Sequence, residues 1–287
     1  MAIGDVRAGV VCGLIAVGVA LSGRAAPSSP SKILSLGVPS AAMGKNVPTT
    51  VILPSDYESR PDRRFPVVYL LHGSGNDQKT YACEPVLSLA DRIGAIVVAP
   101  YGGASWWLDS PRLPKVRYET FVTRELVPYV DAHYRTVADR RGRVIAGHSM
   151  GGHGACFVGF GHTDLFGAVG NAMGGVDIRP FSNCKDLVKL LGEKESHPDD
   201  WTRSSAMTRA AGLKNGEVQF TTVVGTGDFF FGVNRAMHDL LSSNGVAHVH
   251  MEVCGKDREH STHTRTFAYE AMKTLFARFG EFFTEGE

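Results

Sequence analysis

The hexapeptide Gly147-His148-Ser149-Met150-Gly151-Gly152 constrains the fold of this chain more than any other stretch. An apolar run at residues 144–146 precedes it, and a stretch that can be helical, residues 152–160, follows it. The pattern Gly-x-Ser-x-Gly between a strand and a helix predicts a sharp, strained turn with the serine at its tip. Glycine tolerates the backbone conformations and close approaches of such a turn, so the small residues around Ser149 fit this prediction. The alternative is an ordinary glycine-rich connection.

Apolar runs alternate with helical stretches along the rest of the chain. Residues 66–71 and 95–99 form continuous apolar runs, which are typical of strands buried on both faces of a parallel sheet. Residues 118–134 place apolar side chains at helical spacing, and residues 264–283 predict a long closing helix. This alternation predicts an α/β fold with a mostly parallel sheet of about eight strands and helices on both faces. We expect residues 176–216 to be an insertion after the sixth strand that can cap the site.

The composition excludes several classes of partner. The 287 residues carry a net charge of +1 and are 43% hydrophobic, enough for one large domain with a substantial core. No block of basic residues is present, so neither nucleic acid nor an anionic membrane surface is an expected partner. No His or Cys cluster has the spacing of a metal site, so we expect no metal. Three disulfide pairings stay open among the cysteines after the N-terminal segment, Cys83, Cys156, Cys184 and Cys254.

The N-terminal segment differs in composition from the rest of the chain. Residues 8–22 are almost wholly apolar or small, Arg7 precedes them, and small residues surround Ala25. The apolar run is too short to span a bilayer comfortably, so it predicts a secretory signal peptide over residues 1–25. Residues 26–287 would then form a single domain that is secreted or periplasmic. The alternative is an uncleaved N-terminal membrane anchor.

A serine on this kind of turn points to nucleophilic chemistry, for which it needs a base and an acid that orients the base. The acid and then the base are expected on loops after later strands. Asp228 directly follows the apolar run at residues 218–224, within Gly-Thr-Gly-Asp. It is preferred as the acid to Asp177, which follows the preceding strand.

Two histidines, His260 and His263, lie past the final predicted strand. His260 is nearer to the end of that strand, whereas His263 approaches the closing helix. We therefore predict His260 as the base, in a triad with Ser149 and Asp228.

Acyl transfer passes through a tetrahedral oxyanion that requires preorganised N–H donors. One donor is expected to be the backbone N–H of Met150, the residue after the nucleophile. The other should come from the loop at residues 72–75. We expect Ser74 to supply it, with Gly73 as the alternative.

These motifs together resemble the esterase-D-like or "putative esterase" family of α/β-hydrolases. That family includes tributyrin esterases, feruloyl and acetyl-xylan esterase modules, S-formylglutathione hydrolases and mycolyltransferases. The resemblance runs from about residue 33 to residue 283 and is carried by Leu70-Leu71-His72-Gly73, residues 105–111, residues 147–155, Gly225-Thr226-Gly227-Asp228 and His260-Ser261. It implies an α/β-hydrolase fold, the triad Ser149, Asp228 and His260, and oxyanion donors at Ser74 and Met150. One departure is the charged stretch 255–259 before the histidine.

Trp106 and Trp107 lie in the loop after the apolar run at residues 95–99. We expect them to line the substrate cleft, where an aromatic platform would stack on a sugar face or an aromatic acyl group. The alternative places them in the core, because tryptophans are usually largely buried.

The leading hypothesis is a secreted serine carboxylesterase that hydrolyses short-chain acyl esters, with acetyl or feruloyl groups on plant polysaccharide among them. Its partner would be a small-molecule or polysaccharide ester, and it would need no cofactor. A second hypothesis, which the likeness to mycolyltransferases allows, is acyl transfer to a sugar acceptor. A third is a non-catalytic carbohydrate-binding relative, against which the intact Ser149, Asp228 and His260 argue.

Overall fold

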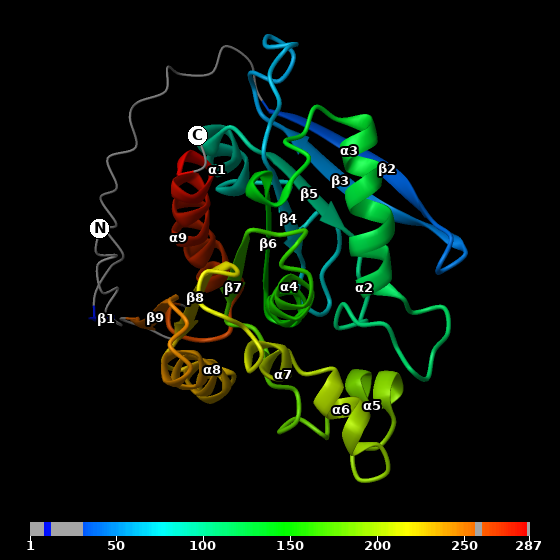
Figure 1. The fold of residues 1–287 in the computed structure, drawn as a ribbon, viewed down its shortest axis with the longest axis vertical. Coiled ribbons are helices and arrows are strands. Elements are labelled where there is room, and N and C mark those ends of the chain that lie inside the picture. Colours follow the sequence, from blue (N-terminus) through cyan, green and yellow to red (C-terminus); the bar gives the residue numbers. More distant parts are fainter. Residues whose placement is uncertain (1–8, 13–30, 256–259, 286–287) are drawn as a thin grey trace.

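The computed structural model describes residues 9–12, 31–255 and 260–285 (Figure 1). The predicted signal peptide lies outside the described residues, apart from the strand β1 (Gly9–Cys12). No helix within the described ranges is long and apolar enough to cross a membrane.

One sheet organises the described chain, with the strand order β1-β9-β8-β7-β6-β4-β5-β3-β2. The strands after β1 are β2 (Lys32–Ser40), β3 (Lys45–Leu53), β4 (Val67–Leu71), β5 (Ile96–Pro100), β6 (Arg143–His148), β7 (Ala168–Ala172), β8 (Gln219–Gly225) and β9 (Val249–Cys254). β3 is antiparallel to β2 and to β5, and every other neighbouring pair in this sheet is parallel. The predicted, mostly parallel sheet is therefore confirmed in β2 to β9, and β1 adds one further strand at the edge.

Helices cover both faces of this sheet. The helices are α1 (Val86–Ile93), α2 (Tyr118–Thr120), α3 (Val127–His133), α4 (Met150–Gly161), α5 (Lys185–Leu191), α6 (Pro198–Arg203), α7 (Ala206–Ala210), α8 (Phe231–Ser243) and α9 (Arg265–Thr284). A π-helical turn, Phe121–Leu126, joins α2 to α3, so the helix expected at residues 118–134 forms with one irregular turn. Figure 1 shows α1 beside α9, in agreement with their contacts, while α4 packs against β4, β6 and β7.

The central strands are buried because helices lie on both of their sides. β4, β5 and β6 are buried along their whole length, as their continuous apolar runs predict. The core is consequently divided by the sheet into two apolar clusters. One contains α4 with Tyr69 and Ile145, and the other contains α1 and α9 with Val68 and Val144. Among the described residues, the cysteines Cys83, Cys156, Cys184 and Cys254 are free thiols.

Candidate active site

The turn that carries Ser149 lies between the end of β6 and the start of α4. Ser149 has φ 56° and ψ −124°, a left-handed conformation that costs free energy for any residue other than glycine. A Cβ atom on Gly151 would lie 1.9 Å from the carbonyl oxygen of Leu71, so a larger residue there would collide with β4. The predicted strained turn is therefore present, and the sequence forms it because glycine permits this close approach.

A continuous chain of hydrogen bonds links the serine to a histidine and a carboxylate. Ser149 Oγ lies 2.7 Å from His263 Nε2, and His263 Nδ1 lies 2.8 Å from Asp228 Oδ2. Because the carboxylate can only accept, Nδ1 carries the ring proton and Nε2 is free to accept from the serine hydroxyl. The side chain of Asp228 is fully buried, and its other oxygen accepts from the N–H of Phe230 at 2.7 Å. These contacts hold the ring in the orientation that a general base requires.

The structure corrects the predicted position of the base from His260 to His263. Gly255, directly after β9, lies against His260, since a Cβ atom on Gly255 would lie 2.5 Å from the carbonyl carbon of His260. The next residue, Ser261, accepts a hydrogen bond from the N–H of Gly227 at 2.9 Å. This contact fixes the loop beside Asp228, so the side chain that reaches Ser149 belongs to a residue further along. Closeness in sequence to the end of β9 was the wrong criterion for choosing the base, because His260 lies against Gly255 and Ser261 lies against Gly227.

The two tryptophans do not line the cleft. Trp107 is 0% exposed and Trp106 is 5% exposed, and both belong to the core. Trp107 fills a slot that two glycines leave open, since a Cβ atom on Gly102 or Gly154 would lie 2.5 or 2.4 Å from its ring. Its indole N–H donates to the carbonyl oxygen of His72 at 3.3 Å. The prediction of an aromatic platform at these positions is therefore wrong.

An exposed aromatic ring does lie at the site, but it belongs to Phe229. This side chain is 62% exposed, and its ring centroid lies 4.2 Å from that of His263. Sequence reasoning did not select it, although its position directly after Asp228 was a usable signal. The ring of Phe229 thus lies beside the histidine that is hydrogen-bonded to Ser149.

A cavity of about 180 Å³ opens beside Ser149. Among the residues that line this cavity are Gly73, Ser74, Tyr81, His148, Ser149 and His263. Ser74, a predicted oxyanion donor, thus lies in the wall of the cavity. The N–H of Met150 is the first of α4, and the first amides of a helix have no partner within the helix. Both residues therefore lie near Ser149, and their role as oxyanion donors stays a prediction.

His148 is a further histidine in this wall. Its Nδ1 lies 2.6 Å from the hydroxyl oxygen of Tyr81. Burial lowers the pKa of His148 to about 3, and the nearby rings of His263 and His72 and the Arg265 charge act in the same direction. The ring is therefore neutral at physiological pH.

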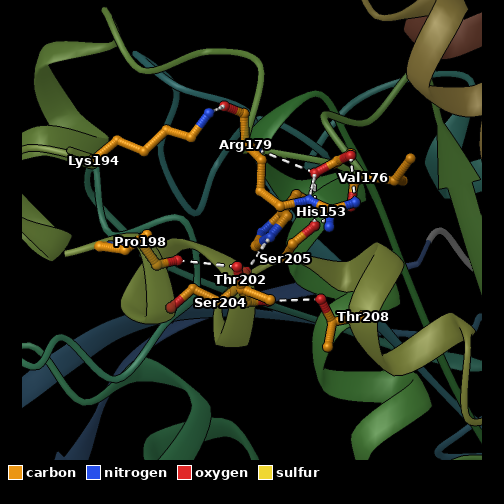
Figure 2. Close-up of polar contacts among 10 residues, drawn as sticks. His153, Val176, Arg179, Lys194, Pro198, Thr202, Ser204, Ser205 and Thr208 are labelled. Carbon is orange, nitrogen blue, oxygen red and sulfur yellow. Dashed lines mark hydrogen bonds and ion pairs between the residues drawn. The ribbon is translucent and has the colours of Figure 1, made fainter.

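The insertion between β7 and β8 is fastened by buried polar contacts (Figure 2). Asp177 accepts from the Arg179 guanidinium at 2.7 and 2.8 Å and from Ser205 Oγ at 3.0 Å. Asp177, the alternative acid, is thus engaged within the insertion, whereas His263 pairs with Asp228.

The same insertion meets α4 through His153. The ring lies between two carbonyl oxygens, with Nδ1 3.1 Å from that of Trp106 and Nε2 2.9 Å from that of Ser204. Figure 2 shows His153 beside Ser204. None of the residues lining the cavity comes from residues 176–216. The insertion therefore packs against α4 and does not cover the cavity beside Ser149, contrary to the expected capping role.

Within the described ranges, no group of three or more His, Cys, Asp or Glu side chains could hold a metal ion.

The sequence is similar to those of known esterases. The sequence matches a protein-family model described as "Putative esterase" over residues 40–274. Esterase Rv1288 of Mycobacterium tuberculosis is 39% identical over 120 residues, which cover 40% of this chain and 26% of that protein. The endo-1,4-beta-xylanase/feruloyl esterase of Xylanibacter ruminicola is 28% identical over 192 residues, covering 61% of this chain and 26% of that protein. The matches thus span about a quarter of the length of these curated relatives.

Solved structures give the same picture of the fold. A ferulic acid esterase superposes with a TM-score of 0.74 at 24% identity, covering 88% of this chain and 99% of that one. Such neighbours have the α/β-hydrolase fold, so the predicted fold class is confirmed.

Proposed function

Because the chain belongs to the putative esterase family, we propose that it is a serine hydrolase that cleaves carboxylic esters through an acyl-enzyme on Ser149. The observation that carries this proposal is the hydrogen-bonded series from Ser149 Oγ through His263 to Asp228. A serine hydroxyl alone is a weak nucleophile, and this arrangement supplies the base and the orienting acid that it needs.

The proposed reaction begins when Ser149 Oγ attacks the ester carbonyl carbon and gives its proton to His263 Nε2. The carbonyl π pair moves to the oxygen, and the tetrahedral intermediate forms. Its collapse breaks the bond to the alcohol, which leaves with the proton from Nε2. Water then attacks the acyl-enzyme, His263 takes a proton from it, and the acid is released as the serine recovers its proton. Asp228 stabilises the charged imidazole in both halves of the reaction.

The backbone N–H groups of Ser74 and Met150 are the proposed donors to the oxyanion. Their support is position, since Ser74 lies in the cavity wall and Met150 begins α4 next to the nucleophile. The helix dipole of α4 adds a partial positive charge at this end. Each such donor is worth about 3 kcal/mol of barrier lowering in related chemistry.

The proposed substrates are short-chain acyl esters, with acetyl and feruloyl esters of small molecules or polysaccharides among them. A cavity of about 180 Å³ beside Ser149 favours a short acyl group over a long alkyl chain. The exposed ring of Phe229 offers apolar contact at the site. A relative named as a feruloyl esterase and a structural neighbour named as a ferulic acid esterase support the aromatic acyl class.

Export is part of the proposal as well. It is supported by the apolar run at residues 8–22 and the small residues around Ala25. The N-terminal sequence of the protein recovered from the medium or periplasm would check it, and recovery of the chain with residues 1–25 intact would contradict it.

The test of the function compares hydrolysis of p-nitrophenyl esters, from acetate to palmitate, and of feruloyl esters by the wild type and three variants. Ser149→Ala and His263→Ala should each lower kcat by at least about a thousandfold, because each removes a member of a unit that acts together. His260→Ala is the matched control and should keep activity near that of the wild type.

Labelling with a fluorophosphonate probe adds a readout that does not depend on the substrate chosen. The wild type should be labelled on Ser149, as mass spectrometry of the peptide would show. An unlabelled, folded protein whose ester hydrolysis survives Ser149→Ala would overturn the proposal. Loss of activity in His260→Ala with retention in His263→Ala would reverse the assignment of the base.

A further inference from the structure

His148 lies next to the nucleophile but takes no part in the hydrogen-bonded series of Ser149, His263 and Asp228. Its side chain is nearly buried, with 9% of the residue exposed, and it forms part of the cavity wall. A buried polar ring at such a place needs partners for both nitrogens. The partners present determine which nitrogen carries the proton.

The hydroxyl of Tyr81 decides the tautomer of His148. It lies 3.0 Å from the carbonyl oxygen of Leu71 and 2.6 Å from His148 Nδ1. A tyrosine hydroxyl has one proton, and we assign it to the bond with the carbonyl oxygen of Leu71, which can only accept. Nδ1 must then donate its own proton to the Tyr81 oxygen. Since the ring is neutral, Nε2 has no proton and is an acceptor.

This acceptor faces the cavity. Among the described residues no hydrogen bond reaches His148 Nε2, whereas Nδ1 is bound to Tyr81. Gly73 keeps the space in front of it open, because a Cβ atom there would lie 2.7 Å from Nε2 and 3.1 Å from Ser149 Cβ. The ring nitrogen and Ser149 thus both lie beside Gly73, which has no side chain to cover them. An accessible acceptor in the cavity wall can take a hydrogen bond from a donor group of a bound ligand.

We propose that His148 Nε2 accepts a hydrogen bond from a hydroxyl group of the substrate, so that the preferred esters carry a free hydroxyl close to the ester group. This inference rests on the proposed function and narrows its substrate class to hydroxylated esters. Two kinds of molecule present such a hydroxyl: a partly acylated polyol or sugar, on the alcohol side, and a hydroxyacyl ester, on the acyl side. Both share one chemistry, an O–H donor a few bonds from the carbonyl.

Two matched substrate series test the proposal on the wild type. On the alcohol side they are the monobutyrate of ethylene glycol, its methyl ether and propyl butyrate. On the acyl side they are ethyl β-hydroxybutyrate, ethyl β-methoxybutyrate and ethyl butyrate. In each series the first compound can donate a hydrogen bond and the other two cannot. We expect kcat/KM to favour the hydroxyl compound over the ether by about tenfold in one series, the size of one hydrogen bond to a buried neutral group.

The variant Tyr81→Phe leaves the His148 ring in place but removes the acceptor for Nδ1–H. The proton can then move to Nε2, which becomes a donor, and an ether oxygen is as good an acceptor as a hydroxyl oxygen. The ratio of kcat/KM for the hydroxyl compound to kcat/KM for the ether should therefore fall towards one. Tyr269→Phe is the matched control, because Tyr269 also lines the cavity but donates to Thr80 at 2.8 Å. It should keep the wild-type preference.

Nitrogen NMR of the imidazole rings gives a readout independent of turnover. In the resting wild type, the His148 signals should show a protonated Nδ1 and an unprotonated Nε2, and Tyr81→Phe should change this pattern. An unprotonated Nδ1 in the wild type would overturn the proposal.

The failure of this inference is distinguishable from failure of the proposed function. Equal kcat/KM for hydroxyl and ether compounds in both series, with all activity lost in Ser149→Ala, would overturn the hydroxyl contact and leave the esterase standing. A preference that survives Tyr81→Phe unchanged would also overturn it. Hydrolysis that persists in Ser149→Ala would overturn the esterase proposal itself.

Discussion

Two buried histidines, His148 and His153, lie on the turn and the helix next to Ser149. They make the stability of the folded protein depend on pH. Burial lowers the pKa of His148 to about 3 and that of His153 to about 4. In the case of His153, the carbonyl oxygens of Ser204 and Trp106 oppose the effect, because they would accept from both N–H groups of a charged ring. Both rings are thus neutral in the folded protein at pH values where an exposed histidine is charged.

The sign of the resulting pH dependence follows from proton uptake. Between about pH 6.5 and pH 4 the unfolded chain binds protons at these two positions that the folded protein does not bind. The stability is therefore complete above about pH 6.5 and declines as the pH falls, by about 1.4 kcal/mol per pH unit for each histidine. Urea unfolding followed by tryptophan fluorescence at a series of pH values measures this decline.

Carboxyl groups also contribute to the pH dependence of the unfolding free energy, and a variant of His153 separates its contribution from theirs. His153→Gln should flatten the slope of unfolding free energy against pH between about pH 6 and pH 5 by about one proton, whatever its effect on the absolute stability. An unchanged slope would mean that the folded protein already holds His153 charged between its two carbonyl oxygens.

At the scale of secondary structure, α9 positions the histidine that meets Ser149. Thr264 is the N-cap of this helix, with φ −120° and ψ 159°, and its side chain accepts from the N–H of Phe267 at 3.1 Å. His263 directly precedes it. The helix packs against β7 and β8 and contacts α1, so its start is fixed relative to the sheet. The cap thus ties the loop that presents His263 to the core.

Loss of this cap should be measurable. Thr264→Ala should lower the free energy of unfolding by about 1 kcal/mol, because it leaves an amide at the helix start without its acceptor. Thr264→Ser keeps the hydroxyl and should restore most of that loss. Equal losses in both variants would show that the threonine methyl group, and not the cap, carries the effect. Chemical denaturation of the three proteins at one pH makes the comparison.

At the scale of the whole molecule, the site is assembled where parallel strands end. Ser149 follows β6, Asp228 follows β8, and His263 follows β9 at the same edge of the sheet. The carboxyl ends of neighbouring parallel strands meet at one edge, which is where ligands bind in such sheets. β1, in contrast, pairs only with Met251 to Cys254 at the outer side of β9.

This topology predicts that the N-terminal segment is dispensable for activity. A chain that begins at Ala26 should fold and hydrolyse esters with kcat/KM within about twofold of the full chain, since Ser149, Asp228 and His263 lie after β6, β8 and β9 and β1 supplies none of them. Ester hydrolysis and circular dichroism of the two chains check it. A folding defect or a large loss of activity would establish β1 as a required strand and contradict removal of residues 1–25 by a signal peptidase.

The sequence by itself determined the features that depend on local backbone chemistry. The strained turn at Ser149 is readable because only small residues fit beside β4, and the continuous apolar runs identify strands covered on both faces. The position of Asp228 is readable because it lies three residues past the end of β8. The resemblance to the putative esterase family is confirmed by the match over residues 40–274.

Only the tertiary structure decided which histidine reaches the serine and which aromatic ring is exposed. His260 and His263 are equivalent in type and close in sequence, and the fold of the loop against Gly255 and Gly227 separates them. Trp107 is buried in the space that Gly102 and the more distant Gly154 leave open, and Trp106 lies close to Gly175, whereas Phe229 is 62% exposed. Likewise, the hydroxyl that contacts His148 Nδ1 belongs to a residue 67 positions away in the sequence. Contacts of this kind depend on how loops close in space, and a one-dimensional pattern does not carry that information.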